Sequence, residues 1–323
     1  MTEFVQRLIG ETRFRQRRFS RKEKDAFLEF LEFELDRLGI SHKRTVIQGM
    51  MRHVHLEAGS DNPDIILLAH YDTQTMLPFW VEWLVRLVGH TRMLLFLAVF
   101  YVLTYLYALL GDTLAAHFVE AVFIVSVLQM SVPSRRTMND NTSGVIALLS
   151  IGRQLNPDPV LRRRVKLVFT DNEERMLAGS FALKRRWRRD GFDYWNKRII
   201  SIDSIGRGNV PVISYNLNPT LARGLEKELS KSSSDAKSVN MWLTPFSDAY
   251  SFSLGGAVNI NMMERSLIPG GFFIRNIHSP LDKEISADNI SLVAGAVCRY
   301  VSVTREKGTL PDFKFSFFRR APA

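Results

Sequence analysis

Five short segments of the sequence carry imidazole and carboxylate side chains in an order that suits metal-assisted chemistry. The segments are His70-Tyr71-Asp72, Asn139-Asp140-Asn141, Asp171-Asn172-Glu173-Glu174, Asp203 and His278. Imidazole and carboxylate groups are ligands that suit Zn²⁺, and two ions that share a carboxylate can lie about 3.5–4 Å apart. Each segment alone is common in loops, but the ordered series is much more specific and predicts a metal site.

Short apolar runs, typical of buried strands, end just before three of these segments. The runs cover residues 65–69, 165–169 and 199–202, and helices are expected over 20–39, 143–155, 180–189, 218–229 and 286–307. This alternation predicts a three-layer α/β/α sandwich around a central mixed, mostly parallel sheet. Sites in open α/β sheets form at the carboxyl ends of the strands, so we expect the segments to meet there.

The ordered series resembles the co-catalytic zinc aminopeptidases of metallopeptidase family 28. That family includes bacterial leucyl aminopeptidases, glutamate carboxypeptidases and glutaminyl cyclases. The resemblance covers about residues 43–75 and 137–305. It implies two bound Zn²⁺ ions, although cobalt and manganese remain open because ligand type does not decide between these metals.

The resemblance also implies a role for each residue of the series. His70 and Asp203 would bind one ion, Glu174 and His278 would bind the other, and Asp140 would bridge both. Asp72 would support His70, and Glu173 would be the general base. The peptide bond after Asp140 is expected to be cis, as in relatives.

The sequence departs from the family pattern in three places. The glycine that usually stands two residues after the Glu pair is replaced within Arg175-Met176, although Gly179 follows as expected. The usual Ser-Asp-His is Ser247-Asp248-Ala249 here, which concerns the pocket wall more than the metals. His70 and Asp140 are also 70 positions apart, a much longer separation than relatives have.

This excess length is a hydrophobic insertion. We expect residues 1–75 and 137–323 to form the zinc-peptidase domain and residues 76–136 to be inserted into it. Residues 93–110 and 114–132 are almost wholly apolar and predict a helical hairpin. At 1.5 Å per residue each helix would be about 27 Å long, near the short limit for crossing a hydrocarbon core. Residues 77–88, with Trp80 and Trp83, predict an interfacial helix before the hairpin.

The charges around the hairpin predict its orientation. Arg86 and Arg92 precede it, Arg135 and Arg136 follow it, and its turn has no Lys or Arg. Under the positive-inside rule both ends lie in the cytoplasm. The expected location is therefore a membrane, with the catalytic domain facing the cytoplasm. The alternative is a homo-oligomer that buries the same surface between its subunits.

Charge and cysteine content narrow the choice of partners. Lys and Arg number 43 against 33 Asp and Glu, which gives a net charge of +10 and favours an anionic neighbour. The basic runs 162–164 and 184–189 lack accompanying nucleic-acid-binding motifs, so lipid headgroups are expected and nucleic acid is not. The single cysteine, Cys298, excludes a disulfide scaffold and a zinc site of thiolates.

The N-terminal region carries a further cluster of positive charge. A run of arginines precedes the helix expected over residues 20–39, for which Ser20 and Glu23 offer a capping box. The run contains Arg13, Arg15, Arg17 and Arg18. Charge runs are usually solvated, so we expect this one at a solvent-exposed start of the helix.

The favoured function is an aminopeptidase that removes N-terminal residues from hydrophobic peptides at the membrane. Other amide chemistry on the same scaffold, namely N-acyl amino acid hydrolysis or glutaminyl cyclisation, uses the same ligands and stays open. A non-catalytic membrane scaffold is disfavoured, because relatives of that kind lose metal ligands and this sequence keeps them.

Overall fold

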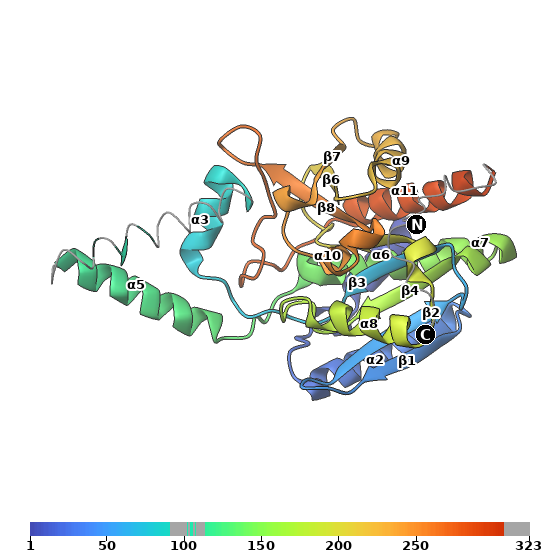
Figure 1. The fold of residues 1–323 in the computed structure, drawn as a ribbon, viewed down its shortest axis with the longest axis horizontal. Helices are drawn as coiled ribbons and strands as arrows, with labels where there is room; N and C mark the ends of the chain where they lie inside the picture. The colour runs from blue at the N-terminus through green and yellow to red at the C-terminus, as the bar shows by residue number, and fades with distance from the viewer. Residues whose placement is uncertain (91–101, 103, 106, 108–113, 307–323) are drawn as a thin grey trace, which may run out of the picture.

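A computed structural model describes residues 1–90, 102, 104–105, 107 and 114–306. It contains a mixed sheet in which eight strands follow one another and a ninth, β9 (Phe272–Phe273), pairs with β8 (Figure 1). The strand order is β1 (His42–Ile47), β2 (His53–Gly59), β4 (Val165–Thr170), β3 (Ile65–His70), β5 (Arg198–Ile202), β8 (Val258–Arg265), β6 (Val210–Tyr215) and β7 (Lys237–Asn240). The central pairs β4–β3, β3–β5 and β5–β8 are parallel, as predicted, whereas β1–β2, β2–β4 and β6–β8 are antiparallel.

Helices cover both faces of the sheet, which confirms the expected three layers. Side chains of β3 alternate between two apolar cores because successive residues of a strand point to opposite faces. Leu67 joins the core formed with α1, α2, α6, α9 and α11, whereas Leu68 joins the core formed with α8 and α10. The helices are α1 (Thr2–Gly10), α2 (Arg21–Arg37), α6 (Ser143–Leu155), α7 (Pro159–Arg164), α8 (Ala178–Arg189), α9 (Pro219–Ser230), α10 (Asp248–Ser251) and α11 (Ala287–Glu306).

The N-terminal arginine run corrects one expectation from the sequence. Arg13, Arg15 and Arg17 are exposed, but Arg18 is fully buried. Its guanidinium donates to the hydroxyl oxygens of Thr137 (3.0 Å) and Thr142 (2.9 Å), so the predicted solvation is wrong at this residue. These partners are more than a hundred positions away along the chain. The capping box of Ser20 and Glu23 at the start of α2 is present as predicted.

The inserted region leaves the sheet edge and returns to it at neighbouring points. The Met76 N–H donates to the Val132 carbonyl, and the Ser134 N–H donates to the Gln74 carbonyl, both at 2.8 Å. Between these points lie α3 (Phe79–Val88) and α5 (Leu114–Met130). The Trp80 indole joins the two helices by donating to the Ser126 hydroxyl at 2.9 Å. Figure 1 shows α5 projecting from the rest of the fold.

The apolar hairpin expected from the sequence is not evident in the described residues. Its second helix corresponds to α5, but its first, residues 93–110, lies outside the described residues except at positions 102, 104–105 and 107. No described helix has both the length and the apolar composition needed to cross a membrane.

Gly179, at the start of α8, tests the packing behind the metal-site loops. A Cβ at this position would lie 1.5 Å from the Asp171 carbonyl oxygen, so Gly179→Ala must displace the backbone that leads to Glu173. We expect the free energy of unfolding in urea to fall by about 3 kcal/mol or more. The control Gly10→Ala meets nothing within 4 Å and should change it by less than about 0.5 kcal/mol. If both variants unfold at the same urea concentration, the close approach at Gly179 is contradicted.

Candidate metal centre

The carboxyl ends of three adjacent parallel strands supply the first part of the centre. His70 is the last residue of β3, Glu173 and Glu174 follow β4, and Asp203 follows β5. Because β3 pairs with both β4 and β5, these side chains reach the same edge of the sheet, as expected for an open α/β sheet.

Asp140 lies between two histidines that come from distant parts of the chain. Its Oδ1 is 3.0 Å from His70 Nε2, and its Oδ2 is 2.6 Å from His278 Nε2. Asp203 Oδ1 lies 3.6 Å from His70 Nε2, and Glu174 Oε1 lies 3.4 Å from His278 Nε2. Each oxygen of Asp140 therefore faces a different ligand group, which is the arrangement that a bridging carboxylate requires.

The structure brings together all seven residues singled out in the sequence. Two sets of three residues each have ligand atoms within 4.8 Å of one another. One set is His70, Asp140 and Asp203, and the other is Asp140, Glu174 and His278. A third set with the same spacing adds Glu173 to His70 and Glu174. The Oε1 of Glu174 is buried without a hydrogen-bond partner, and the donor types suit zinc. The side chains present therefore fit two divalent cations that share Asp140.

The pKa values of the carboxyl groups in the cluster also favour bound cations. Burial raises the pKa of Glu173 well above its ordinary range, and neighbouring carboxylates add to this effect. Burial also raises the pKa of Glu174 to about 7, although the charge of His278 opposes the change. Asp140 differs: burial would raise its pKa, but contacts with His278 and His70 outweigh burial and lower it. The cluster thus contains more carboxyl groups than its two histidines can keep ionised, and divalent cations bound there would lower these raised pKa values.

Asp72 connects His70 to the loop that carries the two glutamates. It accepts hydrogen bonds from the backbone N–H groups of Glu173 (3.1 Å) and Glu174 (3.3 Å). Its Oδ1 also lies 3.5 Å from His70 Nδ1, the ring nitrogen on the side away from Asp140. A carboxylate in this place orients the imidazole and anchors the glutamate loop together.

The backbone at the centre adopts several uncommon conformations. The Asp140–Asn141 peptide bond is cis, as expected from the resemblance. His278 itself and Asn172, just before Glu173, have left-handed φ angles of 53°. Met176, which stands where relatives usually have glycine, also has a left-handed φ of 56°. Met176 therefore adopts a backbone conformation that favours glycine.

Three buried residues around the centre were not assigned a role from the sequence. Asp282 accepts from the backbone N–H groups of Asn139 (2.7 Å) and Asp140 (3.1 Å), which holds the shared carboxylate in place. Asp248 accepts from the Thr170 hydroxyl, and its other oxygen is buried without a partner. Arg18 is a positive charge behind the same cluster. Only the family's Ser-Asp pattern could have drawn attention to Asp248, and no sequence signal singles out Arg18.

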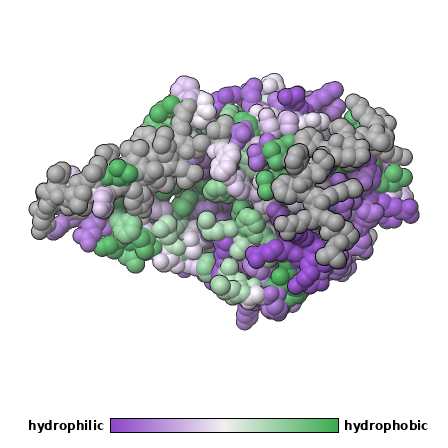
Figure 2. Space-filling model, viewed as in Figure 1, coloured by the Kyte–Doolittle hydropathy of each residue, from purple (hydrophilic) through white to green (hydrophobic). Residues whose placement is uncertain are grey.

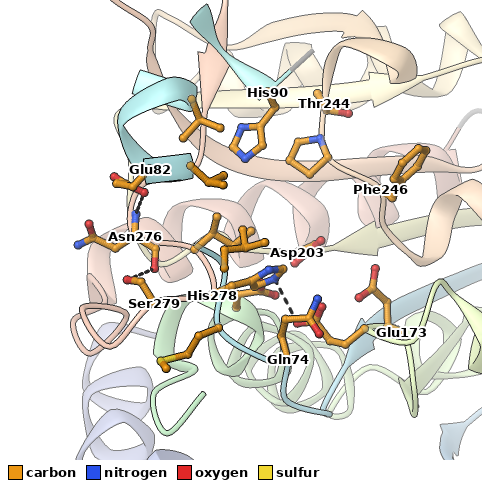
Figure 3. Close-up of a pocket in the computed structure, with 18 of the residues that line it drawn as sticks. Gln74, Glu82, His90, Glu173, Asp203, Thr244, Phe246, Asn276, His278 and Ser279 are labelled. Atoms are coloured by element: carbon orange, nitrogen blue, oxygen red, sulfur yellow. Dashed lines mark hydrogen bonds and ion pairs between the residues drawn. The ribbon is translucent and has the colours of Figure 1, made fainter. Parts of the chain in front are cut away.

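A cavity of about 930 Å³ opens beside the centre, and its lining is predominantly apolar (Figure 3). Metal-site residues form one side, and Leu77, Val81 and Val85 of the inserted region form another. The inserted region also contacts the His278 loop directly. The Leu77 N–H donates to the His278 carbonyl at 2.9 Å, and Glu82 accepts from the Asn276 N–H at 3.0 Å.

Comparison of the sequence with known protein families gives one match. The sequence profile of peptidase family M28 matches residues 112–300, more than half of the chain. The chain belongs to peptidase family M28. No curated protein matches the sequence.

Solved structures share the M28 fold over nearly the whole chain. A glutaminyl cyclase from Porphyromonas gingivalis is 17% identical, with a TM-score of 0.62 and coverage of 94% of this chain and 96% of that one. A leucine aminopeptidase precursor from Bacteroides thetaiotaomicron is 16% identical, with a TM-score of 0.61 and coverage of 93% and 94%. A Zn-dependent exopeptidase from Parabacteroides distasonis is 13% identical, with a TM-score of 0.59 and coverage of 93% and 96%. These likenesses establish the fold, and the named activities belong to those proteins.

The two ligand sets predict two divalent ions per chain. Metal analysis of the purified protein should give a ratio near two, because each set contains three donors. Asp203→Ala removes a donor from one set only and should lower the ratio toward one. The control Asp235→Ala alters a surface carboxylate paired with Arg265 and should keep two ions. Absence of metal from active protein would overturn the assignment, and a single tightly held ion would favour cyclisation.

The hydrogen bond between Glu82 and the Asn276 N–H predicts that α3 affects the affinity for metal. Glu82→Ala removes the acceptor for the Asn276 N–H, two residues before His278, and should weaken zinc binding about tenfold in a chelator competition. Glu82→Gln keeps an oxygen acceptor and should bind zinc much as the wild type does. Glu29→Ala, at an exposed position of α2, is the control. If Glu82→Gln and Glu82→Ala weaken zinc binding equally, the hydrogen bond to the Asn276 N–H does not determine the zinc affinity.

Proposed function

We propose that this M28 protein is a di-zinc aminopeptidase that removes N-terminal residues from hydrophobic peptides. The observation that supports this most is the pair of ligand sets joined through Asp140, with Glu173 beside both. His70 and Asp203 complete the first set, and Glu174 and His278 complete the second. The residues needed for a two-metal site are therefore all present and close together. Intact ligands also argue against a purely structural protein.

In peptide hydrolysis, Glu173 would transfer protons and Asp72 would hold it in place. When bound, zinc polarises a carbonyl and lowers the pKa of water. Glu173 Oε2 lies 3.8 Å from His70 Nε2, so its carboxylate is placed to take a proton from the attacking water and to pass it to the leaving amine. The hydrogen bond from its backbone N–H to Asp72 fixes the position of this group.

The cavity supports a hydrophobic peptide as substrate. Leu77, Val81 and Val85 line it together with Phe246 from the loop after β7. An apolar side chain would be stabilised against this wall, whereas a polar amide buried there without a partner would be disfavoured. This contrast favours hydrophobic N-terminal residues over N-terminal glutamine.

Glutaminyl cyclisation is the alternative that the fold keeps open. The solved structures with this fold include glutaminyl cyclases as well as aminopeptidases, with nearly equal TM-scores. N-acyl amino acid hydrolysis would use the same ligands. A panel of aminoacyl, N-acyl and N-terminal glutaminyl substrates separates the three, and turnover of leucyl or phenylalanyl substrates with free amino groups is the expected result. Preference for glutaminyl substrates would replace the proposal with the cyclase alternative.

The role of Glu173 gives a direct test of the mechanism. Glu173→Gln keeps the shape but removes the base, so kcat should fall about 10²–10⁴-fold while both ions stay bound. Glu174→Gln is the matched variant and should lower metal content, because Glu174 faces His278 in the second ligand set. Loss of metal from Glu173→Gln with retention in Glu174→Gln would mean that the two glutamates have exchanged roles.

A further inference from the structure

The second half of α5 exposes an unusual amount of apolar surface. Phe123 is 51% exposed, Ile124 50% and Leu128 62%. Further exposed apolar side chains are Val125, Val127 and Met130 of this segment and Val132 just after it. We call these seven residues the α5 surface. Figure 2 shows hydrophobic residues gathered over α5 at the end of the molecule where that helix projects.

The α5 surface extends around most of the helix. Successive helical residues are about 100° apart, so Phe123, Ile124 and Val125 alone span about 200°. Val127, Leu128 and Met130 extend the exposed arc to about two-thirds of the circumference by the same spacing. Within the described chain, the remaining side rests on α3 through the bond from Trp80 to Ser126. Helices that pack on one protein partner usually need only an apolar stripe, whereas lipid can contact a helix on many sides.

The α5 surface adjoins the mouth of the cavity. Gln129, within this segment of α5, lines the cavity together with Trp83 of α3. Trp83 is 75% exposed, and Met176, Trp242 and Phe246 are further cavity-lining residues with exposed side chains. Tryptophan suits a membrane interface because its ring is apolar and its N–H can stay hydrated. Apolar surface thus continues from α5 to the cavity mouth.

The charges next to the α5 surface favour an anionic partner. Arg135 and Arg136 are exposed just beyond it, and the chain carries a net charge of +10. Glu120 is the one residue among the Asp, Glu, Lys and Arg types within Leu114–Met130, and it lies one turn before Phe123 and Ile124, at the edge of the α5 surface. Anionic headgroups attract basic residues at the edge of an apolar contact.

We propose that the α5 surface inserts shallowly into an anionic bilayer and holds the cavity mouth against it. No described helix has the length and composition needed to cross a bilayer, and we place α5 within one leaflet. The basic helix α7 lies at the other end of the molecule's long axis (Figure 1). Arg135 and Arg136 follow the α5 surface directly in the chain, and we assign them to this contact.

Flotation of the full-length protein with lipid vesicles tests the proposal. Vesicles of phosphatidylcholine mixed with phosphatidylglycerol should carry the wild type upward, and vesicles of phosphatidylcholine alone should carry much less. Phe123→Ser with Leu128→Ser should reduce partitioning at least about tenfold. Arg135→Glu with Arg136→Glu should reduce it about fivefold or more per residue, but only with anionic vesicles. The control Leu254→Ser changes a leucine that is 59% exposed outside the α5 surface and should float like the wild type.

Zinc content and thermal unfolding of each variant show whether the fold is intact. Flotation measures binding without catalysis, so an error in the proposed enzymatic function would leave this test unaffected. Failure of the wild type to float, or an equal loss in Leu254→Ser, would overturn the proposal. So would light scattering that finds a wild-type dimer, a monomeric Phe123→Ser/Leu128→Ser variant and no vesicle binding, because a second copy of the chain would then cover the α5 surface.

Discussion

Asp140 contacts His70 with one oxygen and His278 with the other, inside a group of carboxylates that repel one another. Burial makes this repulsion costly, because little water is present to screen it. The protein stabilises the group partly through backbone donors. Asp72 accepts from the glutamate loop, and Asp282 accepts from the two residues of the Asn139–Asp140 segment. These bonds fix the loops, whereas ionisation of the buried glutamates still needs compensating positive charge, which divalent cations could supply.

Positive charge from the N-terminal region supports the same loops from behind. Lys24 of α2 is buried and donates to Asp171 at 2.6 Å and to Asn172 at 2.7 Å, directly before the two glutamates. Arg18 is buried beside the segment that leads to Asp140, bonded to Thr137 and Thr142. A buried cation is tolerated only when it is paired or well hydrogen-bonded. The N-terminal region is therefore part of the framework of the metal centre.

The parts of this framework that the sequence predicted are those with local signals. Continuous apolar runs identified β3, β4 and β5, and α6 begins and ends at the predicted residues. The residues of the centre follow these elements in the chain, so their convergence at one sheet edge could be expected. The outer strands β1 and β7 are half-exposed and polar and lack such a run. Arg18 could not be recognised because its partners lie far along the chain, and a charged run normally remains in water.

The segment between Thr75 and Pro133 leaves the ligands on either side undisturbed because of where it begins and ends. Its ends pair with each other at Thr75 and Pro133, so the path from His70 to Asp140 is closed locally whatever lies beyond. Yet the chain returns to the centre at this point, where Leu77, just before α3, and Glu82 of α3 bond to the segment that contains His278. Change within α3 can therefore reshape the cavity and reposition a metal-site residue while the strands that carry the other ligands stay as they are. The cavity wall and the segment that contains His278 are therefore joined through α3 and the residues just before it.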